Sequence, residues 1–316
     1  MLSYALRRLL IAIPIFFLVT VMVFLFMHLS PGEPEVIAAV RGMSEEQAEE
    51  LRHDLKLDRP LAQQYFYWIG NMLQGDAGKS DLYNTSVTGL LKNRFPNTLR
   101  LGVMTLVIAT LIGIPLGILA AVKANKLPDY VTRGLAVLAL AIPGFWLAIL
   151  AIVMPAKLWG IAPSLSYVPW EENRWENFEF FLIPAALLGL HLVGVILRMT
   201  RSMMLEVLTS DYIRTARAKG LPETLVLRRH ALRNALIPIV TVIGTQAAWL
   251  VGGSVVIEKI FGIPGVGSLL VDSVTYKDFH IVQAIAVYLA AFVLLINLLV
   301  DLSYGFLDPR IRHRTS

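Results

Sequence analysis

Residues 101–122 read LGVMTLVIATLIGIPLGILAAV, an apolar run of 22 residues without Asp, Glu, Lys or Arg. A helix needs about 20 apolar residues to cross about 30 Å of hydrocarbon. Because the bilayer core offers the backbone no hydrogen-bond partners, a run of this length is expected to cross it as a helix. One such run could also be a buried helix of a water-soluble protein, so the neighbouring sequence must separate the two.

Five further runs of 18 to 23 residues share this lack of charge, and they cover residues 9–29, 134–156, 180–197, 235–257 and 281–300. A soluble protein does not bury six such segments. The composition agrees, because 56% of the residues are hydrophobic and 16% are charged, against about 45–50% and about 25% in soluble domains. The sequence therefore predicts an all-α integral membrane protein with six transmembrane helices.

The first run resembles a signal peptide only in being preceded by Arg7 and Arg8. It is longer than a signal peptide's apolar region, and residues 28–35 (HLSPGEPE) offer no small-x-small cleavage site. We therefore predict an uncleaved helix. The chain has no cysteine, which excludes a disulfide framework and a thiolate zinc or redox site.

The charges between the runs predict the orientation. With the N-terminus inside, the internal segments hold 16 of the 28 Lys and Arg residues and 6 of the 23 acidic residues. The positive-inside rule then places both termini in the cytoplasm and residues 30–100, a long loop after the first helix, outside. The basic pI of 9.4 thus reflects topology, and we expect no nucleic-acid partner.

This topology divides the chain into four parts. Residues 1–30 form the cytoplasmic N-terminus and first helix, and residues 31–100 form an external loop with amphipathic helices. Residues 101–304 form a five-helix core that includes a cytoplasmic loop at 202–234 and an external re-entrant loop at 258–280. Residues 305–316 form a cytoplasmic tail.

The external loop has two helix signals. Ser44-Glu45-Glu46-Gln47 is typical of a capping box and precedes a helix-forming run to Leu55. Pro60 suits a helix start. Apolar residues then recur at helical spacing at positions 61, 65, 68, 69, 72 and 73. This amphipathic helix either lies at the membrane interface or packs against the protein's own surface.

Residues 75–80, Gly-Asp-Ala-Gly-Lys-Ser, end like a phosphate-binding loop. The first glycine of the G-x-x-x-x-G-K-[ST] pattern would fall on Leu73, no strand precedes it, and the predicted location is external. We therefore expect no nucleotide site there. Residues 261–267, Phe-Gly-Ile-Pro-Gly-Val-Gly, favour a re-entrant turn that either faces a substrate path or caps the bundle.

The cytoplasmic loop contains a helix from Asp211 that Gly220 and Pro222 end, and a second helix that starts at Pro222 and runs to His230. This element resembles the EAA motif of ABC importer permeases, through which the membrane subunit docks on its ATPase. Arg214 and Thr215 replace the motif's Glu and Ala, and Pro238 lies further from the glycine. The resemblance implies that the ATPase-coupling residues are Arg214, Thr215, Ala216, Arg217, Ala218, Lys219, Gly220 and Leu221.

Other segments are similar to the dipeptide/oligopeptide/nickel/glutathione class of these permeases. They are residues 1–9 (MLSYALRRL), 30–34 (SPGEP), 96–99 (PNTL), 198–208 (RMTRSMMLEVL), 229–235 (RHALRNA) and 308–312 (DPRIR). The resemblance implies a type I ABC importer permease of the bacterial inner membrane that moves a peptide-like substrate by alternating access.

The same resemblance implies the partners. They are a second homologous permease subunit, two cytoplasmic ATPase subunits and an external, periplasmic substrate-binding protein, all assembled on the lipid bilayer. It implies that ATP and Mg belong to the ATPase subunits, so that this chain binds no cofactor.

The residues leave two other functions open. An ion-coupled secondary transporter usually carries ionisable groups inside the membrane, where the six runs hold only His28 and His191. A channel would need a selectivity filter, and no segment resembles one. The chain also offers no nucleophile–base pair and no metal cluster, so we expect it to be non-catalytic. Thr241, Thr245 and Gln246 either line a substrate path or form hydrogen bonds between helices.

Overall fold

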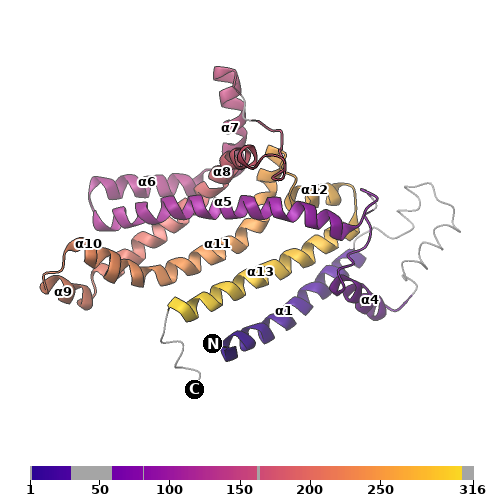
Figure 1. The fold of residues 1–316 in the computed structure, drawn as a ribbon, viewed down its shortest axis with the longest axis horizontal. Helices are drawn as coiled ribbons and strands as arrows, with labels where there is room; N and C mark the ends of the chain where they lie inside the picture. The colour runs from indigo at the N-terminus through magenta and orange to yellow at the C-terminus, as the bar shows by residue number, and fades with distance from the viewer. Residues whose placement is uncertain (1, 30–58, 81, 162–163, 308–316) are drawn as a thin grey trace. The chain divides into compact units, whose positions relative to one another are not determined.

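The computed structural model describes residues 2–29, 59–80, 82–161 and 164–307, and these residues are helical apart from loops and one isolated bridge between Lys79 and Ser86. The predicted helix at 44–55 lies outside them. The elements are α1 (Leu2–Leu29), α4 (Leu61–Leu73), α5 (Val87–Val122), α6 (Leu127–Ala141), α7 (Gly144–Trp159), α8 (Arg174–Leu208), α9 (Asp211–Ala218), α10 (Glu223–Leu225), the π-helix η1 (Val226–Ala231), α11 (Leu232–Phe261), α12 (Val266–Thr275) and α13 (Phe279–Leu307). Figure 1 shows them as ribbons.

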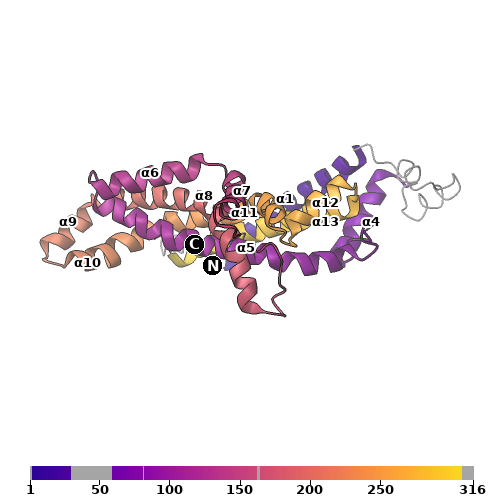
Figure 2. The same cartoon turned by 90° about the horizontal axis from the view of Figure 1, so that it is seen from above.

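Five of the six predicted runs fall on helices long and apolar enough to cross a membrane: α1, α5, α8, the segment from Glu223 into α11, and α13. The run at 134–156 is instead divided into α6 and α7, which meet at 93° (Figures 1 and 2). The bend follows from Pro143, because a proline disfavours helical geometry in the residue before it. Ile142 accordingly has an extended conformation, with φ −85° and ψ 125°.

The chain divides into two compact units. The first comprises residues 96–268 and the described part of 296–316, and the second comprises residues 2–95 and 269–295. In the first unit, α8 packs against α6, α7 and α11. Its apolar core has Phe181, Leu192, Ile196 and Phe261 among its fully buried or nearly buried side chains. This unit carries the loop that resembles the EAA motif.

Two glycines bring α5 close to α8. A Cβ added to Gly113 would lie 2.9 Å from Ile196 Cγ2, and one added to Gly117 would lie 2.8 Å from the Leu197 carbonyl oxygen. These distances are shorter than van der Waals contact, so only glycine permits the approach. Glycines spaced by four residues are a common means of close helix packing in membranes, where dispersion contacts replace the hydrophobic effect.

Gly117→Ala is expected to destabilise the chain by about 1–3 kcal/mol, since the added methyl group meets backbone that cannot move aside. Gly102 lies on the same helix, and a Cβ added there would have nothing within 4 Å, so Gly102→Ala is a matched control. That control should be neutral or stabilise slightly, by up to about 1 kcal/mol, because alanine favours the helix. Thermal unfolding in detergent measures both. Equal melting temperatures for the two variants would contradict the close-packing argument.

A buried ion pair fixes α6 against α8. Arg201 donates from Nε to Asp129 Oδ1 at 2.6 Å and from Nη2 to Asp129 Oδ2 at 2.8 Å. The Asp129 side chain is fully buried, and Arg201 is 21% exposed. The backbone N–H of Asn125 also donates to Asp129 Oδ2. The carboxylate is therefore satisfied by three donors, which is the condition for burying a charge.

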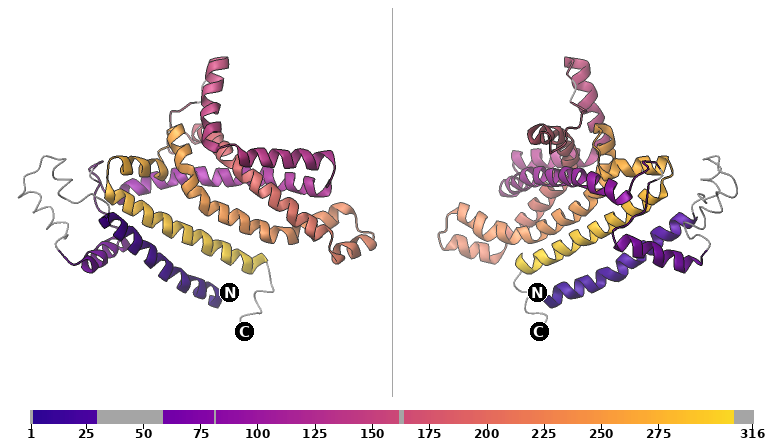
Figure 3. Two further views of the ribbon diagram at one scale, coloured as in Figure 1. Left: turned by 180° about the vertical axis from the view of Figure 1, so that it is seen from behind. Right: turned by 45° about the vertical axis from the view of Figure 1, so that its right-hand side comes forward.

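In the second unit, α4 packs on α1, as the ribbon in Figure 3 shows. Tyr65 is buried between Phe17 and Phe24, and its hydroxyl lies 2.8 Å from the Thr20 hydroxyl. This contact confirms that the apolar face of α4 packs against the protein itself. Phe66 and Leu73, 65% and 74% exposed, lie on another face and leave the predicted contact with the membrane interface open.

Candidate ATPase-coupling site

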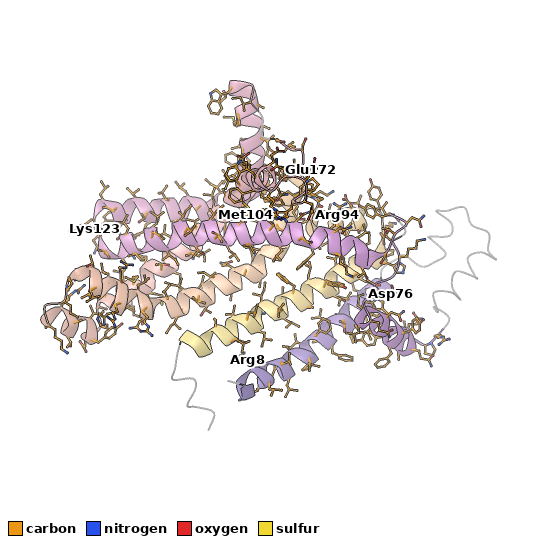
Figure 4. The ribbon with its side chains drawn as sticks, in the orientation of Figure 1. Arg8, Asp76, Arg94, Met104, Lys123 and Glu172 are labelled. Carbon is orange, nitrogen blue, oxygen red and sulfur yellow. The ribbon has the colours of Figure 1, made fainter. Side chains whose placement is uncertain are left out.

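The loop between α8 and α11 forms a projecting hairpin at one end of the first unit (Figure 1). Its first arm is α9, and its second arm is α10 followed by η1. Gly220 joins the arms with φ +76°, a conformation that glycine adopts at little cost. The predicted helix–glycine–helix element is thus present, although its second arm is one α-helical turn followed by a π-helix. Figure 4 labels Lys123, beyond α5, at the same end of this unit.

The inner side of the hairpin packs against the chain itself. Ile213 and Ala216 are buried in a cluster with Val226, Ala231 and Ala235. Ala216 is therefore packed within the chain, and its small size serves this packing. The hairpin and the start of α11 thus share one apolar cluster.

The outer side is polar and open to a partner. Six of the eight predicted coupling residues are exposed, namely Arg214, Thr215, Arg217, Ala218, Lys219 and Gly220, while Leu221 is half-buried against the inner cluster. Exposed Arg228, Arg229 and Arg233 extend the positive charge along the second arm into α11. The hairpin thus has a buried apolar inner face and an exposed basic outer face.

An ion pair braces the turn at Gly220. Arg217 donates from Nη2 to Glu223 Oε1 at 2.7 Å and from Nε to Glu223 Oε2 at 3.1 Å, so it links the two arms. Hydrogen bonding to this carboxylate raises the pKa of Arg217 above its usual value. Arg214 pairs with Asp211 at 3.3 Å within α9. Sequence reasoning did not identify Glu223, because a carboxylate six residues from an arginine carries no signal until a turn brings them together.

A second link joins the hairpin to α11. Asn234 donates from Nδ2 to the Tyr212 hydroxyl at 2.9 Å and to the His230 carbonyl oxygen at 3.1 Å. Neither Tyr212 nor Asn234 was singled out from the sequence. The two residues are 22 positions apart, so no short sequence pattern indicates that they interact.

The predicted substrate-path residues lie on α11. Thr241 and Thr245 are four residues apart and therefore share a face of the helix. Their hydroxyls donate to the carbonyl oxygens of Ile237 and Val242, at 3.2 and 2.9 Å, within the same helix. Gln246 is half-buried beside them. Nearby, His191 of α8 stacks on Trp249 with 5.5 Å between ring centroids. A role for these residues in a substrate path stays a prediction.

The stretch that ends like a phosphate-binding loop uses its N–H groups internally. The N–H of Ala77 donates to the Thr88 hydroxyl, that of Gly78 to Asp76, and that of Ser80 to the Thr85 carbonyl. A phosphate cradle needs such groups to be free.

Within the described residues there is also no group of three or more His, Cys, Asp or Glu side chains placed to hold a metal ion.

Comparison with protein families matches both parts of the chain. Residues 113–313 match the family described as "Binding-protein-dependent transport system inner membrane component". Residues 1–102 match the family's separately described N-terminal region. Together the two matches extend over nearly the whole sequence.

Curated relatives align over their full length. The chain is 40% identical over 338 residues to the dipeptide transport system permease protein DppB of Escherichia coli strain K12, which covers 99% of this chain and 100% of the relative. It is 41% identical over 314 residues to the glutathione transport system permease protein GsiC of Pectobacterium atrosepticum, with the same coverage. A putative peptide transport system permease protein of Brucella abortus strain 2308 is 40% identical over 313 residues.

Solved structures share the fold. An inward-facing form of the MetNI methionine ABC transporter matches with a TM-score of 0.55 at 20% identity, covering 69% of this chain and 96% of that chain. An amino acid ABC transporter crystallised with histidines matches with a TM-score of 0.53 at 17% identity, covering 68% and 93%. At such identities the similarity is one of fold.

Proposed function

Because the chain belongs to the binding-protein-dependent transport system inner membrane component family, we propose that it is the membrane-spanning permease subunit of an ATP-driven importer for di- or oligopeptides. The chain is a multi-pass protein of the bacterial inner membrane. Relatives named for dipeptide, peptide and glutathione transport, each about 40% identical over 99% of this chain, support a peptide-like substrate.

The observation that carries this proposal is the hairpin of α9, Gly220, α10 and η1. It presents exposed basic residues outward and rests inward on α11, so a force on the hairpin reaches a membrane helix directly. In our proposal one of two cytoplasmic ATPase subunits, which bind ATP and Mg, docks here, and the other docks on the corresponding loop of the second permease. A second homologous permease completes the pathway, and an external binding protein delivers the peptide. The ion-coupled alternative is not favoured, because the relatives are permease subunits of transport systems of this family.

Uptake by the reconstituted system tests the function. The chain is purified with its partner permease, ATPase and binding proteins, and the complex is placed in liposomes that contain ATP and Mg. We expect uptake of a labelled dipeptide that needs the binding protein, stops when ATP is replaced by a non-hydrolysable analogue, and persists with a proton ionophore. Uptake driven by a proton gradient without ATP would refute the proposal in favour of the ion-coupled alternative.

Reversing the charges of the Arg217–Glu223 pair tests whether Arg217 acts by holding the two arms of the hairpin together or by contacting the ATPase itself. If Arg217 acts by holding Glu223, then Arg217→Glu should reduce copurification of the ATPase, and adding Glu223→Arg should restore it. An exposed pair contributes no more than about 1 kcal/mol, so we expect a partial loss in the single variant. Quantitative copurification from detergent measures both. Failure of the double variant to recover would show that the ATPase itself contacts Arg217.

A further inference from the structure

Glu258, three residues before the end of α11, is a completely buried carboxyl group. Its Oε1 accepts hydrogen bonds from the Thr98 hydroxyl at 2.8 Å and the Ser254 hydroxyl at 3.1 Å. Its Oε2 accepts from the backbone N–H of Ser268 at 2.9 Å. Burying a carboxyl group is costly unless hydrogen bonds compensate it, and here hydroxyl and N–H groups from three segments supply them.

The turn after α11 is built around this carboxyl group. The turn follows directly after α11, and the Ser268 N–H at the start of α12 donates to Glu258. A side chain on Gly265 would collide with the carboxyl group, and one on Gly267 would lie 2.8 Å from the Val255 Cα. The two glycines after Pro264 are therefore explained by the approach of Glu258 and α11 to the turn.

The same group ties the turn to α5. The Thr98 hydroxyl donates to Glu258 and also accepts from the Val266 N–H at 2.8 Å. Its neighbour Asn97 donates from Nδ2 to the Pro264 carbonyl oxygen at 2.9 Å. Thr98 is thus a bridge whose one hydroxyl joins α5, α11 and α12. Removing that hydroxyl breaks two bonds at once.

The far end of α11 lies at the coupling hairpin. α11 contains 30 residues, and at 1.5 Å per residue it is about 45 Å long. At its start, Ala235 and Ile239 belong to the same buried apolar cluster as Ile213 and Ala216 of the hairpin. At its end, Glu258 bonds to α5 and to the turn. One helix therefore connects the hairpin with the Glu258 cluster, and Figure 1 shows its course.

We propose that Glu258 is a positioning residue for transport: with Thr98 it locks the end of α11 to α5 and to the turn, so that docking of the binding protein is transmitted along α11 to the ATPase hairpin. This inference rests on the proposed function. An apolar contact could hold the turn without the cost of desolvating a carboxyl group. A hydrogen-bonded carboxyl group instead holds α5, α11 and the turn in one relative position. Such a fixed arrangement is required if a movement of the turn is to be passed to α11.

The test uses the reconstituted complex with all its partners. ATPase activity per assembled complex is measured without and with peptide-loaded binding protein, and the ratio is the stimulation. We expect Thr98→Val and Glu258→Gln to lower the stimulation by roughly tenfold, as for the loss of strong hydrogen bonds, while the unstimulated rate is retained. Thr98→Ser keeps the hydroxyl and should restore the wild-type stimulation.

Thr105→Val is the matched control. Thr105 is also fully buried on α5, and its hydroxyl has no hydrogen-bond partner among the described residues, so the same substitution should leave the stimulation unchanged. Wild-type stimulation in Thr98→Val would overturn the inference. An equal fall of the unstimulated and stimulated ATPase rates would also overturn the inference, because a general loss of folding lowers both rates together. If the wild-type complex itself shows no stimulation and no uptake, the proposed function fails instead.

Discussion

Arg201→Ala is expected to destabilise the chain by about 3–5 kcal/mol, because it leaves a buried carboxylate without its countercharge. Asp129 is fully buried and receives two hydrogen bonds from Arg201, at 2.6 and 2.8 Å. In the variant, the Asn125 N–H still donates to Asp129, but one backbone group cannot compensate the lost charge.

Arg217→Ala serves as the control for this prediction. Arg217 also pairs with a carboxylate, but the two side chains are 42% and 53% exposed, and such a pair contributes at most about 1 kcal/mol. Thermal unfolding in detergent should therefore separate the two variants clearly. The double variant Arg201→Met with Asp129→Leu should recover much of the loss, because apolar pairs often replace buried ion pairs without penalty. Equal melting temperatures for the two alanine variants would show that water reaches Asp129.

Gly220→Val is expected to abolish most of the copurification of the ATPase while membrane insertion stays normal. The backbone of Gly220 has φ +76°, and nothing lies within 4 Å of the position of an added Cβ. The effect therefore comes from backbone strain alone, about 1–3 kcal/mol, rather than from a clash. A β-branched residue is the least tolerated there, so the arms of the hairpin would rearrange and misplace the outer face.

The matched control is Gly160→Val. Gly160 follows α7, has φ +68°, and likewise has nothing within 4 Å, but the charge pattern places it on the external side. We expect a similar loss of thermal stability in both variants and a loss of ATPase copurification only in Gly220→Val. Wild-type copurification and transport in Gly220→Val would show that this hairpin is not the coupling element.

Particular residues show where sequence reasoning succeeded and where it stopped. The pattern from 211 to 230 predicts two helices separated by Gly220, and the hairpin has this form, because helix-favouring and helix-breaking residues act locally. The run at 134–156 predicts one helix, and Pro143 divides it. Pro115, Pro155, Pro184 and Pro238 lie inside helices, so a proline in an apolar run does not by itself reveal which position breaks the helix.

The sequence by itself determined that the described chain is helical and which segments are long and apolar enough to cross a membrane. Both properties are local, because each helix satisfies its own backbone hydrogen bonds and each apolar run carries its own preference for hydrocarbon. The tertiary structure alone decided that Ala216 faces inward, that Arg217 holds Glu223, and that Thr98 bonds to Glu258, 160 positions away. Such contacts arise only when packing brings separate segments within about 3 Å, a distance that no spacing along the chain encodes.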